Sequence, residues 1–326
     1  MNAAPFGASW EYIMREPELL AALTRGREAV DEYMAFWVMT NGSWNEEPAT
    51  EILCQKSAPL VKPITFDRTK EGVTGADWLW WWVDRETGIC FGMFVQAKSL
   101  KRKGKGWSID FEHKNKSGVQ LPDLLRTADH YKVPPVYVLY CGDASYRAGL
   151  ICGDSHTEPD CNRCARAGVS VLSARVAQRR LLNDPGSAAV EAFHDASPLE
   201  YLADPALPRT RFWDLNFPSC GHELKRMLVA PNYGPQQVAS VIWKQMSKIR
   251  TRGDYELAVA GKVDIGSGMI FRDLPADRGH FPVPYYPHVL SGLRFELPSY
   301  VRDVEAGSSL PPSLTRHIKG IAIFYM

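Results

Sequence analysis

The stretch of sequence that decides the fold is DWLWWWVDRETGICFGMFVQAK, residues 77–98. Apolar and aromatic residues at 76–84, and apolar residues at 89–98, each predict a buried strand. The polar segment 84–88 between them ends in glycine, which is typical of a hairpin connection. The stretch therefore predicts two neighbouring strands joined by a short turn.

The segments around this hairpin continue an α/β pattern. A turn-and-cap cluster at 41–45, followed by two acidic residues and an early proline, predicts a helix from about 46 to 59. Strands are expected at 61–66 and 136–140, with a helix at 121–131 before the second of them. The predicted order is helix, three strands, helix, strand.

The chain divides into three expected parts. Helical spacing at 17–39 predicts an N-terminal helical segment within residues 1–44, followed by an α/β core at 45–150. Residues 151–326 form a mixed C-terminal elaboration or a second domain. In this last part we expect helices at 173–182, 188–193 and 236–250, and a final strand at 318–325.

Composition is that of an ordinary globular protein. The chain has 326 residues, of which 45% are hydrophobic and 23% charged, with a net charge of +1. Attraction to a polyanion would therefore need a local basic patch. No apolar run approaches the roughly 20 residues that span a bilayer, so we expect no membrane association and a cytoplasmic location. Seven cysteines without a signal peptide argue for reduced thiols.

Side chains suited to phosphodiester hydrolysis gather around the predicted hairpin. Side chains alternate along a strand, so Gln96 and Lys98 share one face, and pairing could bring Asp77 alongside them. Upstream, Glu47 and Glu51 are four residues apart and can share one helix face. Oxygen ligands for Mg²⁺ and a cation near the phosphate are what this hydrolysis requires. Glu47 is favoured as the helix ligand, because it lies in the first turn, and Glu51 stays open.

These motifs carry a resemblance to a known superfamily. Glu47, EGVTGADW at 71–78 and VQAK at 95–98 resemble the PD-(D/E)xK restriction-endonuclease-like superfamily. The run TGADWLWW followed by VQAKSL is similar to an uncharacterised bacterial family of that fold. The QxK ending also resembles Mrr-type restriction enzymes. The resemblance covers roughly residues 45–141.

The resemblance implies a central mixed sheet flanked by helices and a Mg²⁺-dependent endonuclease that cleaves DNA, with Mn²⁺ as a substitute, in restriction or antiphage defence. By position, Asp77 would be the metal ligand and Lys98 the lysine that positions water or stabilises charge. Gln96 departs from the usual acid, and a neutral amide oxygen predicts weaker metal affinity or a single metal. Gln120 resembles a glutamine that supports the site in some members.

A run of basic residues follows the predicted lysine. Its members are Lys101, Arg102, Lys103 and Lys105. A flexible basic loop beside a metal site is well placed to bind nucleic-acid phosphates, and each contact would make binding sensitive to salt. The alternative is a solvated hairpin loop.

The tryptophans of the first strand allow two interpretations. Trp78, Trp80 and Trp82 would share one face of the sheet, and Trp81 would point to the other. We expect most of them in the core, rather than in a platform that stacks on bases.

A second candidate site contains sulfur and imidazole ligands. The spacing of Cys152, His156, Cys161 and Cys164 could close a tetrahedral structural Zn²⁺ site, with Cys220 or His222 as substitutes. Unligated thiols in a loop are the alternative.

Other functions and partners fit the same residues. Gln96 could mark lost catalysis in a nuclease-fold module that binds nucleic acid or a partner protein, and RNA could replace DNA as the substrate. A homodimer is expected by analogy with restriction enzymes. No Walker-type phosphate loop is present, so energy-driven translocation would need a partner, such as an operon-encoded defence protein.

Overall fold

The computed structural model describes residues 18–66, 78–112, 114–115, 118–151, 161–183, 188–206, 222–229, 234–251, 270–271, 285–309 and 318–326. Its helices are α1 (Glu18–Met39), α2 (Glu46–Lys56), α3 (Gln120–Tyr131), α4 (Ala144–Ile151), α5 (Asn162–Arg166), α6 (Ala174–Asn183), α7 (Ala188–Asp195), α8 (His222–Val229), α9 (Gly234–Thr251), α10 (Tyr285–Leu290) and α11 (Ser299–Glu305), with a 3-10 helix η3 (Leu199–Leu202). Its strands are β1 (Val61–Thr65), β2 (Trp78–Val83), β3 (Cys90–Ser99), β4 (Lys101–Lys103), β5 (Gly106–Ser108), β6 (Lys114–Asn115), β7 (Gly118–Val119), β8 (Pro135–Tyr140), β9 (Val169–Ser173), β10 (Ser197–Pro198), β11 (Leu293–Arg294) and β12 (Gly320–Tyr325).

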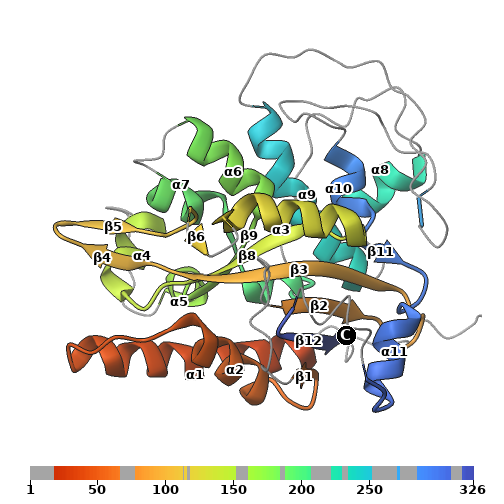
Figure 1. Ribbon diagram of the computed structural model, residues 1–326, viewed down its shortest axis with the longest axis horizontal. Helices are drawn as coiled ribbons and strands as arrows, with labels where there is room; N and C mark the ends of the chain where they lie inside the picture. The colour runs from red at the N-terminus through yellow and green to blue at the C-terminus, as the bar shows by residue number, and fades with distance from the viewer. Residues whose placement is uncertain are drawn as a thin grey trace, which may run out of the picture.

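One mixed sheet forms the centre of the molecule. Its strand order is β1-β12-β2-β3-β8-β9-β10, and β11 pairs with the start of β3. β2 runs antiparallel to β3, whereas β8 runs parallel to β3 on its other side. Figure 1 shows α1 and α2 on one side of this sheet, and α3, α6 and α9 on the other. The chain is therefore an α/β protein with a mixed sheet between helical layers.

The expected order of helix, three strands, helix and strand is confirmed by α2, β1, β2, β3, α3 and β8. The helices expected near both ends and the final strand are also present, as α1, α6, α7, α9 and β12. α2 ends at Lys56 rather than at residue 59, because Ala58 precedes Pro59 and a residue before proline is disfavoured in a helix. None of the described helices has the length and apolarity needed to cross a bilayer.

The turn between β2 and β3 is built from its own side chains. Asp84 Oδ1 accepts hydrogen bonds from the backbone N–H groups of Glu86 at 2.8 Å and Thr87 at 3.2 Å. Gly88 has a φ of 75°, in the left-handed region that glycine adopts without strain. These local features fix the hairpin and hence the register, in which Trp78 lies opposite Val95.

The tryptophans of β2 are core residues, as expected. Trp78, Trp80, Trp81 and Trp82 are each at most 4% exposed. The ring of Trp82 stacks on Phe324 of β12, with 4.2 Å between ring centroids and 14° between planes. On the other face, Trp81 occupies the space above Gly92, where an added Cβ would lie 2.6 Å from the ring. These rings are therefore packed in the core and do not form an exposed platform for stacking on bases.

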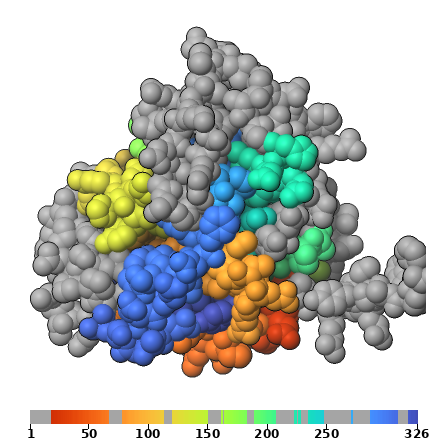
Figure 2. All heavy atoms as spheres, turned by 90° about the vertical axis from the view of Figure 1, so that its right-hand side faces the viewer, coloured from red at the N-terminus to blue at the C-terminus, as the bar shows by residue number. Residues whose placement is uncertain are grey.

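The C-terminal part of the chain is built into the same sheet as the earlier strands. β12 lies between β1 and β2, antiparallel to the first and parallel to the second. In Figure 2 the blue C-terminal residues lie against orange residues from the first third of the chain. One ion pair across this junction joins Lys62 Nζ to Glu305 Oε1 at 3.3 Å. The described strands after residue 151 thus complete the sheet that the core begins.

Candidate functional site

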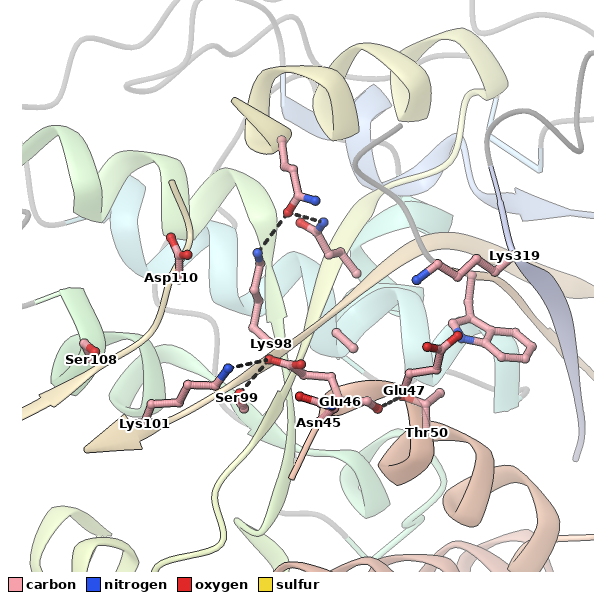
Figure 3. Close-up of a pocket in the computed structure, with 14 residues that line it drawn as sticks. Asn45, Glu46, Glu47, Thr50, Lys98, Ser99, Lys101, Ser108, Asp110 and Lys319 are labelled. Atoms are coloured by element: carbon pink, nitrogen blue, oxygen red, sulfur yellow. Dashed lines mark hydrogen bonds and ion pairs between the residues drawn. The ribbon is translucent and has the colours of Figure 1, made fainter. Parts of the chain in front are cut away.

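A polar pocket of about 390 Å³ lies where the start of α2 faces the end of β3. Its other walls come from the first residues of β2 and α3, from the β4-β5 hairpin and Asp110 after it, and from Lys319 just before β12. Figure 3 shows that Glu46 and Glu47 approach the pocket from α2, while Lys98, Lys101 and Lys319 enter it from other elements. Segments distant in sequence therefore meet around one cavity.

The pocket contains the QxK motif of β3. Gln96 and Lys98 are 3% and 7% exposed, and both line the cavity. Gln120, the first residue of α3, accepts hydrogen bonds at its Oε1 from Gln96 Nε2 at 2.9 Å and from Lys98 Nζ at 3.0 Å. The structure thus brings together the two predicted β3 residues and the predicted supporting glutamine.

The hydrogen bonds of Lys98 determine how both amides are oriented. An ammonium group only donates, so the Gln120 atom beside Lys98 Nζ must be the oxygen. That oxygen can accept from Gln96 only if the nitrogen of Gln96 faces it. Gln96 Oε1 is consequently turned away from Gln120, and it is buried without a hydrogen-bond partner among the described residues. A buried amide oxygen of this kind is a neutral candidate ligand for a hard cation.

The start of α2 brings carboxylates to the pocket. Glu46, Glu47 and Thr50 line the cavity, as expected for positions i, i+1 and i+4 of a helix. Thr50 Oγ1 also lies 2.8 Å from Tyr140 Oη, which attaches α2 to β8. Glu51 is exposed and is not one of the lining residues, because it lies one helical turn further from the helix start. Of the two acids predicted from spacing, the structure brings Glu47 to the pocket.

Three charged residues of the pocket were not assigned from sequence. Glu46 accepts a hydrogen bond from Ser99 Oγ at 2.5 Å and lies 4.0 Å from Lys101 Nζ. Asp110 follows β5, and Lys319 precedes β12. Glu46 had a local signal, since it shares the first turn of α2 with Glu47. Asp110 and Lys319 had none, because only the tertiary fold brings them to the site.

The acidic candidate of the motif, Asp77, lies outside the described residues. Its neighbour Trp78 opens β2 and lines the pocket. Within the described ranges, no group of three histidine, cysteine or acidic side chains could hold a metal ion. Among the predicted residues that the structure describes, the oxygen donors at the pocket are Glu47 and Gln96 Oε1.

The basic segment after β3 forms the β4-β5 hairpin, with Gly104 at a φ of 61° in its turn. Lys101, Arg102, Lys103 and Lys105 are all exposed on it. Trp107 of β5 packs against Tyr146 of α4 with ring centroids 5.0 Å apart. Figure 1 shows the hairpin projecting past the end of β3. The segment is therefore a β-hairpin, and of its four basic residues only Lys101 lines the pocket.

The candidate zinc residues fall partly outside the described ranges. Cys152 and His156 are not described, and neither is Cys220. Cys161 is half-buried immediately before α5, and Cys164 is buried within it. His222 is the first residue of α8. The proposed tetrahedral arrangement is therefore not described as a whole.

The shared acceptor Gln120 allows a direct test of how the site is held. Gln120→Met keeps the length of the side chain but removes the acceptor used by Gln96 and Lys98. We expect the free energy of unfolding to fall by about 1–3 kcal/mol, measured by urea denaturation, because buried donors lose their partner. Gln120→Glu retains an acceptor and should keep most of the stability. The matched control is exposed Gln55→Met, with an expected change within about 0.5 kcal/mol; equal stabilities for both methionine variants would contradict the prediction.

The chain was compared with protein families, curated proteins and solved structures. A model described as a family of unknown function (DUF6615) matches residues 29–318, which is most of the chain. No curated protein matches, and no solved structure matches. The matched range includes α2, the β2-β3 hairpin and α3, which provide most of the pocket.

Proposed function

We propose that this chain, which belongs to the family of unknown function DUF6615, is a Mg²⁺-dependent nuclease that hydrolyses phosphodiester bonds in DNA. The observation that carries the proposal is the convergence of Gln96, Lys98 and Gln120 on a pocket that Glu47 also lines. A cluster of oxygen donors with a nearby ammonium is the equipment that this hydrolysis requires.

The metal would be held by oxygen atoms of three residues. Glu47 contributes a carboxylate, and Gln96 contributes an amide oxygen that lacks a hydrogen-bond partner among the described residues. Asp77 is added from the sequence motif alone. A bound divalent cation would neutralise phosphate charge and polarise the phosphoryl group. Because the amide is neutral, we expect weaker metal affinity than a site with a carboxylate at residue 96 would have.

Among the described residues, Lys98 is the one to which we assign a direct catalytic role. Its hydrogen bond to Gln120 fixes the ammonium at the pocket wall, so no reorganisation is needed when charge develops on the phosphate oxygens. The ammonium is largely shielded from water, which strengthens its interaction with an anion. Lys98 would therefore stabilise the transition state, while Gln120 acts as its positioning residue.

The cellular role that we propose is restriction or antiphage defence. This part of the proposal rests on the similarity of TGADWLWW and VQAK to restriction-endonuclease-like sequences. Cleavage of foreign DNA by a single chain requires only the nuclease reaction itself. In a homodimer, two sites would act on the two strands of DNA. An operon-encoded partner would control when the enzyme is active.

A binding function without catalysis is the second candidate. It is favoured by Gln96, which stands where the enzymes that the sequence resembles usually have an acid. Under this alternative the pocket and the β4-β5 hairpin would bind nucleic acid or a partner protein without hydrolysis. The result that distinguishes this alternative from a nuclease is DNA binding with no cleavage in either Mg²⁺ or Mn²⁺.

The proposed function predicts cleavage that depends on both metal and Asp77. Purified protein should nick supercoiled plasmid in Mg²⁺, with Mn²⁺ as a substitute, and EDTA should abolish the reaction. Asp77→Asn should lower the rate by at least about 100-fold, because it replaces a charged ligand with a neutral one. The matched control is exposed Asp303→Asn on α11, which should cleave like wild type. Plasmid nicking that is equal in wild type and Asp77→Asn, or that persists in EDTA, would refute the assignment.

A further inference from the structure

Lys319 enters the candidate pocket from the position just before β12 and is not part of the QxK motif. It is exposed, and its side chain points into the cavity in Figure 3. Its backbone is held in place, because Lys319 O accepts a hydrogen bond from Phe66 N–H at 3.0 Å. The ammonium is thus presented from a fixed position at one end of the pocket.

Gly320 explains how Lys319 can lie so close to β2. An added Cβ at residue 320 would lie 2.5 Å from the ring of Trp78 and 2.8 Å from the carbonyl oxygen of Ile64. Because Gly320 has no side chain, the Trp78 ring can pack against its backbone, directly beside the cavity. The close approach of β12 and β2 therefore places Lys319 on the pocket rim.

The lysines of the pocket are spread along the direction of β3. Gly320 pairs with Trp78, and Trp78 pairs with Val95, so Lys319, one residue before Gly320, lies near the level of Gln96 on β3. Lys98 follows along β3, and Lys101 begins the hairpin beyond its end. Five residues separate the levels of Gln96 and Lys101, which is roughly 17 Å at about 3.3 Å per residue. The three lysines therefore occupy successive levels along the direction of β3, with Lys319 set to one side, across β2.

We infer that the substrate is a nucleic-acid strand lying lengthwise along β3, with its phosphates contacted by Lys319 at one end and by Lys101 at the other. The inference rests on the proposed nuclease function and adds the path of the substrate to it. A span of roughly 17 Å equals about five nucleotides at 3.4 Å per nucleotide, so a mononucleotide would be too short to reach both ends. Lys319 thus becomes a substrate-contacting residue supplied by the C-terminal strand.

Acidic groups in the same pocket shape this interaction. Glu46, Glu47 and Asp110 face the same cavity and would repel phosphates. A divalent cation between the α2 carboxylates and the substrate would remove that repulsion. Binding should therefore be measured with a divalent cation present, and Ca²⁺ is suitable because it accepts oxygen ligands in flexible geometry.

The test measures the salt dependence of DNA affinity by fluorescence anisotropy, in Ca²⁺, with a labelled duplex of about 20 base pairs. Lys319→Met and Lys101→Met should each reduce the slope of log affinity against log salt by about one unit, and weaken affinity by about 3- to 10-fold at about 0.1 M salt. The double variant should lose about two units. Lys319→Arg retains the charge and should behave like wild type.

Exposed Lys56 at the end of α2 is the matched control, since it does not line the pocket. Lys56→Met should leave affinity and slope unchanged, and thermal unfolding should show that all variants are folded. If Lys319→Met matches Lys56→Met while wild type binds and cleaves DNA, the lengthwise path is wrong and the nuclease function stands. If the double variant binds DNA as tightly as Lys101→Met does, the proposed lengthwise path is also wrong. If wild type neither binds nor cleaves nucleic acid, both proposals fall.

Discussion

Lys98→Met is expected to reduce the rate of Mg²⁺-dependent DNA cleavage by about 100- to 1,000-fold. Methionine preserves much of the side-chain length and its apolar contacts but removes the ammonium that Gln120 holds at the pocket wall. The lost group is preorganised and 7% exposed, so water cannot readily replace it. Single-turnover cleavage of a labelled duplex would measure the rate of the chemical step.

Two further measurements separate catalysis from folding and binding. Gln120 Oε1 still accepts from Gln96 Nε2 in the variant, so the thermal transition should stay close to that of wild type. Lys56→Met, which changes an exposed lysine outside the pocket, should cleave at the wild-type rate. If folded Lys98→Met protein cleaves DNA at a rate within about threefold of wild type, Lys98 does not stabilise the transition state.

Trp82→Ala is expected to lower the free energy of unfolding by about 3–5 kcal/mol. Trp82 is fully buried, and its stack on Phe324 joins β2 to β12. Truncation removes this contact and leaves a cavity between two central strands, where the surrounding backbone has little freedom to collapse. Because whole domains are stable by only about 5–15 kcal/mol, the loss should be evident in urea or thermal denaturation.

The controls for this prediction vary size and location. Trp82→Phe keeps an aromatic ring and should cost less than Trp82→Ala. Phe36→Ala removes a ring that is 54% exposed on α1, and its effect should be within about 0.5 kcal/mol. A Trp82→Ala protein as stable as Phe36→Ala would mean that the stack on Phe324 contributes little to the fold.

Local patterns in the sequence were sufficient for the elements that carry the QxK motif. The apolar runs of β2 and β3 and the turn that Asp84 and Gly88 form between them are encoded by neighbouring residues. The helix start ahead of Glu47 has the same local character. These features explain why Gln96 and Lys98 could be assigned to one site from their spacing, whereas Gln120, which contacts both, was assigned from the resemblance alone.

Pairings between distant segments left no comparable signal. Nothing in the sequence near residue 320 indicates that β12 enters the sheet between β1 and β2. The contributions of Lys319 and Asp110 to the pocket follow from such long-range arrangements. The choice between Glu47 and Glu51 also depended on where the helix meets the sheet, since spacing alone gives both the same face.

The position of β12 has a consequence for the order of events during biosynthesis. β1 and β2 leave the ribosome long before β12, yet in the finished sheet they are separated by it. Before β12 is made, β1 lacks its described partner and β2 can pair only with β3, and contacts between such distant segments form slowly. A polypeptide without this segment would thus lack the wall of the pocket that Lys319 provides, so the proposed site would be complete only after β12 had been synthesised.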